Sequence, residues 1–177
     1  MNPRGEQKVW IEYSVGERVL LDGEVYEVVS TQRNRWGGPT CRVGTVEGGR
    51  KRWLTPRTEG QHAAVVDKRA IGDVIERFYE RVRGDDLLAP VFDAKVSDWD
   101  AHRERMGRTW CGVFLGEPAE PGAPPPAYGA LRALDAPQVD RWAALFEDAA
   151  RDVFVPELAA EVVERARKTA DALRAEG

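Results

Sequence analysis

The stretch VVDKRAIGDVIERFYERVRG, residues 65–84, repeats an apolar side chain at every fourth position. The repeated positions are Val66, Ala70, Val74, Phe78 and Val82. This spacing puts apolar side chains on one face of an α-helix, and Gly84 is a typical residue at a helix C-terminus. The stretch therefore predicts an amphipathic helix that buries one face in an apolar core.

The same helical period continues to the end of the chain. It predicts three further helices, within residues 97–116, 136–154 and 156–177. Ser97, followed three residues later by Asp100, predicts a capping box at the start of the first of them. Pro156 suits the first position of the last one. The second part of the chain is therefore predicted to be all-α.

Before residue 55 the pattern changes to short strands rich in Val, Tyr, Trp and Ile. The predicted strands are residues 9–13, 17–21, 24–29, 41–47 and 50–54. Asp22-Gly23 lies between two of these runs and predicts a tight hairpin. The fold class is therefore predicted as α+β in two domains: a small SH3-like antiparallel β-barrel over residues 1–58, then an all-α domain over residues 59–177.

Composition sets the general class of the protein. The formal net charge is −4 and 42% of the residues are hydrophobic, which is typical of a globular domain. The first ten residues have no apolar core of a signal peptide, and no apolar run reaches the roughly 20 residues that a membrane helix needs. We therefore expect a cytoplasmic protein in which Cys41 and Cys111 are free thiols.

The predicted barrel carries a basic stretch. Between Arg33 and Arg57 there are seven basic residues and one acidic residue. Arginine and tryptophan together can bind phosphate and stack on bases, but we expect Trp36 and Trp53 to be core residues beside a solvated arginine face. Nucleic-acid binding at physiological salt is therefore not expected of the basic candidates, which are Arg33, Arg35, Arg50, Lys51 and Arg52. An unidentified protein, or the acidic helical part of the same chain, is the alternative partner for them.

Several fragments of the helical part, in order, resemble one known family. They are Phe78-Tyr79, ERVRGDDLLAPVF (80–92), DWDAHRERM (98–106) with Trp110 and LGE (115–117), and DRWAALFE (140–147). From about Ile71 to the C-terminus the chain resembles a group III truncated haemoglobin, a globin-like fold that binds haem. The first 60 residues have no counterpart in that family.

The resemblance implies roles for five aromatic or imidazole side chains. Tyr79 and His102 are matched to the distal pair, which donates hydrogen bonds to a ligand held on haem iron. Trp142 is matched to the indole near that ligand, and Trp110 to a wall of the pocket. Tyr79, Trp110 and Trp142 also lie on apolar helical faces, where core packing alone would explain them. Tyr128 stands where the family has the proximal histidine that binds the iron.

A tyrosine at that position leaves two interpretations open. A phenolate binds ferric iron and needs a nearby cation, which Arg132 would supply four residues further on. In contrast, Pro124–Pro126, Thr109 and Glu120 depart from the family pattern on the same side of the expected pocket. We expect that ordinary histidine-ligated haem has been lost, so that no cofactor binds and the globin scaffold serves as a non-enzymatic interaction or regulatory module without catalytic residues. The alternative is a haem b protein that binds O2 or NO, with Tyr128 or His102 as the metal ligand.

Overall fold

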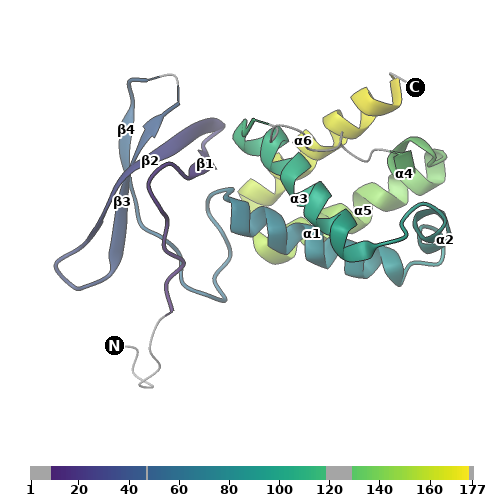
Figure 1. Ribbon diagram of the computed structural model, residues 1–177, viewed down its shortest axis with the longest axis horizontal. Coiled ribbons are helices and arrows are strands. Elements are labelled where there is room, and N and C mark those ends of the chain that lie inside the picture. Colours follow the sequence, from purple (N-terminus) through teal and green to yellow (C-terminus); the bar gives the residue numbers. More distant parts are fainter. Residues whose placement is uncertain (1–8, 47, 119–128, 176–177) are drawn as a thin grey trace.

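The computed structural model describes residues 9–46, 48–118 and 129–175, and it contains a small sheet followed by a group of packed helices (Figure 1). The strands are β1 (Arg18–Leu21), β2 (Glu24–Arg33), β3 (Pro39–Thr45) and β4 (Lys51–Leu54). They pair antiparallel in the order β1-β2-β3-β4. Asp22 and Gly23 join β1 to β2 with φ angles of 51° and 75°, so the predicted hairpin is confirmed.

The sheet is open, and the SH3-like barrel is not confirmed. Among the strands of the described residues, β1 pairs with β2 and β4 with β3, and no ladder joins β1 to β4. The expected first strand, residues 9–13, does not join the sheet: Trp10 forms an isolated bridge with Thr58, and Ile11 donates to the carbonyl of Arg57. That segment is bonded to the chain that follows β4, so it does not connect β1 to β4.

One face of the sheet covers a small core. Its members are Tyr13, Val19, Tyr26, Val28, Cys41, Val43 and Val65. The expectation that Trp36 and Trp53 belong to this core is wrong, because their side chains are 76% and 58% exposed. Leu54 is half-buried against the small core, so strand alternation turns its neighbour Trp53 to the opposite face. Trp36 lies in the turn between β2 and β3.

The helices enclose a larger core. They are α1 (Lys68–Arg83), α2 (Ala89–Asp93), α3 (Trp99–Leu115), α4 (Gly129–Arg132), α5 (Ala136–Val153) and α6 (Pro156–Ala175). Helix α1 packs against α3 and α5, and α5 packs against α6 (Figure 1). Gly84 ends α1 and Pro156 begins α6, as predicted. No described helix is both long enough and apolar enough to cross a membrane.

The start of α3 differs from the sequence prediction. The N-cap of α3 is Asp98, whose carboxylate accepts from the amide of Ala101 at 3.0 Å, so the predicted box of Ser97 and Asp100 is wrong. A carboxylate one residue later provides the same acceptor. A capping box does form at α5, where the Asp135 and Gln138 side chains each bond the other residue's backbone.

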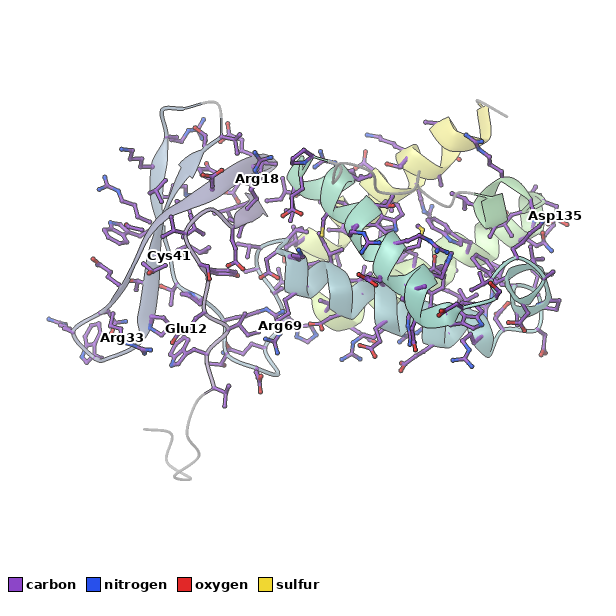
Figure 2. The ribbon with its side chains drawn as sticks, viewed as in Figure 1. Glu12, Arg18, Arg33, Cys41, Arg69 and Asp135 are labelled. Carbon is purple, nitrogen blue, oxygen red and sulfur yellow. The ribbon has the colours of Figure 1, made fainter. Side chains whose placement is uncertain are left out.

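The sheet is attached to the helices at β1 and at the segment before α1. Leu20 and Val66 exchange backbone hydrogen bonds, and both belong to the helical core. The Tyr13 hydroxyl donates to the Asp67 carboxylate, which caps α1. Arg18 lies at the border between the sheet and the helices (Figure 2) and donates to the carbonyl of Gly116. The predicted domain boundary at residues 58/59 falls within this connecting segment and stays a prediction.

Candidate functional site

Helices α1, α3 and α5 bring together four of the residues that the sequence singled out. Tyr79, His102, Trp110 and Trp142 are all buried, and all four line one cavity of about 20 Å³. The other lining residues are Phe78, Phe92, Met106, Ala130 and Leu131. Residues from α1, α2, α3, α4 and α5 therefore surround a single small space in the helical core.

Helical spacing explains why these side chains meet. His102, Met106 and Trp110 follow one another four residues apart on α3, which puts them on one face of that helix. On α5 the same spacing places Trp142 over Phe146, and their rings stack with centroids 5.5 Å apart. Each helix thus presents a row of large side chains to the interior.

Tyr79 and His102 are in direct contact. Their ring centroids are 4.9 Å apart with an edge-on angle of 78°. Phe92 and Trp99 pack edge-on against Tyr79, so the phenol lies among aromatic rings. Burial raises the pKa of Tyr79 well above its ordinary value of about 10. The side chain is therefore a neutral phenol that can donate a hydrogen bond.

His102 has an unsatisfied nitrogen in this cavity. Its Nε2 is buried and has no hydrogen-bond partner among the described residues. Burial, followed by the nearby positive charge of Arg105, lowers the pKa of His102 to about 4. The imidazole is therefore neutral at physiological pH. One ring nitrogen can donate its N–H, and the lone pair of the other can accept a hydrogen bond or bind a metal. A buried polar atom without a partner needs an explanation, and a ligand provides one.

Arg105 is a site residue that sequence reasoning missed. Its Nε is also buried without a hydrogen-bond partner among the described residues. The available signal was its position three residues after His102, which places both side chains on neighbouring positions of one helical face. A positive charge therefore lies near the neutral imidazole of His102, although Arg105 does not line the cavity itself.

An ion pair at the start of α5 was also missed. Arg141 Nε donates to Asp85 Oδ2 at 2.6 Å, and the other carboxylate oxygen accepts from the amides of Leu87 and Leu88. Burial alone would raise the pKa of Asp85, but the bonds from Arg141 and from the two amides lower it below its usual range. Because Arg141 belongs to α5 and Asp85 to the loop after α1, this pair holds the two segments together next to Trp142.

The predicted proximal side is only partly described. Tyr128 lies outside the described residues, as do Pro124–Pro126 and Glu120. Arg132 ends α4 and is exposed, so its pairing with Tyr128 stays a prediction. The Thr109 hydroxyl donates to the backbone carbonyl of Arg105, within its own helix.

The residue types around the cavity suit haem, but the side chains are packed so closely that the cavity is small. A space of about 20 Å³ holds roughly one water molecule, so a planar cofactor requires the aromatic rings to move apart. The donor set is nevertheless suitable, because it combines apolar aromatic walls with a neutral imidazole whose Nε2 has no partner among the described residues, and the half-buried Arg105 lies nearby.

Comparison with known proteins points to the same family as the residues do. The chain is 28% identical over 109 residues to the "Group 3 truncated hemoglobin ctb" of Campylobacter jejuni, covering 59% of this chain and 86% of that protein. It also matches the crystal structure of a group III truncated hemoglobin from Campylobacter jejuni, with 26% identity and a TM-score of 0.53, covering 66% of this chain and 94% of that one. No protein-family model matches the chain. The C-terminal part of this chain is therefore homologous to the group III truncated haemoglobin of Campylobacter jejuni, and the N-terminal sheet lies outside that homology.

Proposed function

We propose that the helical part of this protein binds haem b in the cavity between α1, α3 and α5 and presents it to a small ligand such as O2 or NO. The observation that carries the proposal is the buried, unpartnered Nε2 of His102 in a cavity walled by aromatic rings. The homology to a truncated haemoglobin supports it. The expectation of a haem-free scaffold therefore becomes the rival of this proposal.

The roles of the chain's own residues follow from their protonation states. Tyr79 is a neutral phenol and His102 a neutral imidazole, so each can donate one hydrogen bond into the cavity. Such donors are effective in a site without water, because no solvent competes for them. Trp110 and Trp142 exclude water from the same space. Haem iron, when bound, supplies the coordination position for the small ligand.

Arg105 has a role on the anionic side of the cofactor. Its buried Nε lacks a partner among the described residues, and haem carries two carboxylates. A guanidinium forms short, charge-assisted bonds with a carboxylate. We therefore assign Arg105 to the binding of one propionate.

Two residues are candidates for the bond to iron. Tyr128 would bind as a phenolate, which favours ferric iron. His102 would bind through its neutral imidazole, since its pKa of about 4 leaves the lone pair free above that pH. The two ligands differ in the spectrum that they give, so a spectrum separates them.

The test is the visible absorption spectrum of the purified protein, before and after addition of haemin. We expect a Soret band with one haem per chain. Tyr128→Phe should abolish a phenolate-to-iron charge-transfer band if Tyr128 is the ligand, and His102→Leu should then leave that band in place. Tyr26→Phe and His62→Leu are matched controls, because these residues lie in the sheet and in the segment before α1.

The absence of a Soret band, before and after addition of haemin, would overturn the proposal. A protein that carries no haem and takes up none from haemin would be the haem-free interaction module. The narrow cavity favours that rival, because its rings are already packed together. A stoichiometric Soret band that persists in every single variant would show that the ligand is neither Tyr128 nor His102.

A further inference from the structure

The sheet has an exposed face that the haem proposal does not use. Strand alternation turns Cys41, Val43 and Leu54 toward the small core, and it turns Arg42, Lys51 and Trp53 to the other side. At the β1 edge this second face packs on the helices through Leu20 and Val25. Farther along the sheet, Trp53 and Val29 are 58% and 45% exposed.

The exposed residues on β3 and β4 are neighbours across the ladder. Arg42 and Trp53 are directly paired, and the guanidinium carbon of Arg42 lies 5.8 Å from the indole centroid. Lys51 precedes Trp53 by two residues on the same strand, so both side chains point to the same side. Arg35 stacks on Trp36 at the turn between β2 and β3, at 4.0 Å. Both exposed indoles thus have an arginine beside them.

Among the basic residues from Arg33 to Arg57, those beside the indoles are the ones without an ion pair to a described residue. Arg33, Arg50, Arg52 and Arg57 form ion pairs with Glu12, Glu24, Asp22 and Asp73, respectively. Arg35, Arg42 and Lys51 have no carboxylate partner within the described part of the chain. The basic residues beside the exposed indoles are therefore the ones available to an anionic ligand.

The charge of the chain is divided in the same way. Residues 1–58 contain ten basic and seven acidic residues, a net +3, and residues 59–177 contain sixteen basic and twenty-three acidic residues, a net −7. The two values add to the formal net charge of −4. The net negative charge of the helical part repels a polyanion, so the exposed face of the sheet is the more favourable surface for one.

We propose that the exposed face of β3 and β4, with Trp53, Arg42 and Lys51 and extended by the Arg35–Trp36 turn, binds single-stranded nucleic acid. An exposed indole stacks on an unpaired base of any sequence, and the adjacent cations bind the flanking phosphates. A duplex keeps its bases stacked inside, so it offers the indole no face. This reverses the expectation from the sequence, which depended on both tryptophans being core residues.

The test is the fluorescence anisotropy of a labelled 12-nucleotide oligo(dT), titrated with the full chain at several salt concentrations. We expect binding at 50 mM salt that weakens as salt rises, with a log–log slope of about −0.7 for each phosphate neutralised. Trp53→Ala should weaken binding about 5- to 100-fold through the lost stacking. Arg42→Gln and Lys51→Gln should each reduce the magnitude of the slope by about 0.7.

Matched controls separate the sheet face from general charge. Lys168→Gln makes the same change on α6, where the lysine is exposed and paired with Glu164, and it should leave affinity unchanged. An oligo(dT)·oligo(dA) duplex of equal length should bind more weakly than the single strand. Should Trp53→Ala fail to fold by circular dichroism, the double variant Arg42→Gln/Lys51→Gln decides the question through the salt slope.

Four results would overturn the proposal. They are no binding of the oligonucleotide by up to about 100 µM protein at 50 mM salt, full affinity in folded Trp53→Ala, equal affinity for the duplex, and equal loss in Lys168→Gln. Competition by polyglutamate at the same charge concentration would assign the surface to an acidic protein instead. None of these measurements depends on haem, so they stand or fall separately from the haem proposal.

Discussion

The two parts of this chain use tryptophan in opposite ways. In the helical part, Trp110 and Trp142 are buried and touch the same phenylalanine, Phe146. In the sheet, Trp36 and Trp53 are largely exposed, each beside an arginine. The difference arises because the helices that the structure describes enclose a shared interior, whereas its strands cover a core on one face and leave part of the other to solvent. The two buried tryptophans therefore stabilise the helical part, and the two exposed ones are available for binding in the sheet.

The largest expected effect tests this comparison directly. Phe146→Ala should lower the free energy of unfolding by about 3–5 kcal/mol, because it leaves a cavity among Phe78, Trp110 and Trp142. Trp53→Ala should change it by less than about 1 kcal/mol, since an exposed side chain loses little burial. Urea denaturation of both variants measures the two values. Similar losses would mean that Trp53 is buried in solution and would break the comparison.

A second prediction concerns the pH dependence of stability, which His102 should dominate at mildly acid pH. Its folded pKa is about 4 and its unfolded value is about 6.5. Between these values the unfolded state binds more protons, so stability should fall as pH drops from 6.5 to 4, by roughly 3 kcal/mol, and then level off. Denaturation at several pH values measures this slope. His102→Gln should flatten it.

The same substitution at the exposed His62 provides the matched control. The two residues are the chain's only histidines. A slope that survives in His102→Gln and disappears in His62→Gln would show that the buried imidazole does not carry the effect. That result would also remove the neutral His102 on which the haem proposal depends.

A smaller loss of stability is expected at the ion pair beside Trp142. Asp85→Ala should lower the free energy of unfolding by about 1 kcal/mol, because the amides of Leu87 and Leu88 lose their acceptor. The lowered pKa of Asp85 means that wild type has this contribution above about pH 4 and loses it as pH falls further. Thermal melts at pH 7 and pH 3 measure both effects. Asp86→Ala, at the exposed neighbouring position, is the control and should melt like wild type.

The smallest effect compares the two thiols, one in each core. Burial raises the pKa of both Cys41 and Cys111 to about 11, so neither should react quickly with a thiol reagent at pH 7.5. Reaction requires local opening, and the small core of the sheet should open more readily than the helical core. Cys41 should therefore label before Cys111, as followed by peptide mass spectrometry. Equal rates would indicate that the two parts open as one unit.

Much of the helical part could be predicted, because each helix repeats its apolar residues along one face. The convergence of Tyr79 and His102 followed from a family resemblance, and local pattern alone does not show that α1 and α3 meet there. Arg105 was missed because an arginine on a helix is usually solvated. Ser97 was chosen over Asp98 because two adjacent residues offer nearly the same cap.

The sheet was harder to predict, because strand periodicity does not say which face is covered. Residues 9–13 have the composition of a strand but bond to the segment after β4. The sequence pattern places Trp53 and Leu54 on opposite faces of the sheet, as the structure has them. Whether Trp53 is buried, however, depends on whether another part of the protein covers its face. Short strands gain their partners from distant parts of the chain, and a local pattern contains no information about those partners.

The bond from Arg18 to the end of α3 connects the two parts energetically. Arg18 belongs to β1 and donates to the carbonyls of Leu115 and Gly116, where the helix dipole is negative. The same helix carries His102 and Trp110 on its inner face. A ligand that moved α3 relative to β1 would change this bond, and thermodynamic linkage would make any effect on the sheet's own ligand equal in size to the reverse effect. Arg18→Ala should weaken such coupling without abolishing it, because the Leu20–Val66 and Tyr13–Asp67 bonds still join the two parts.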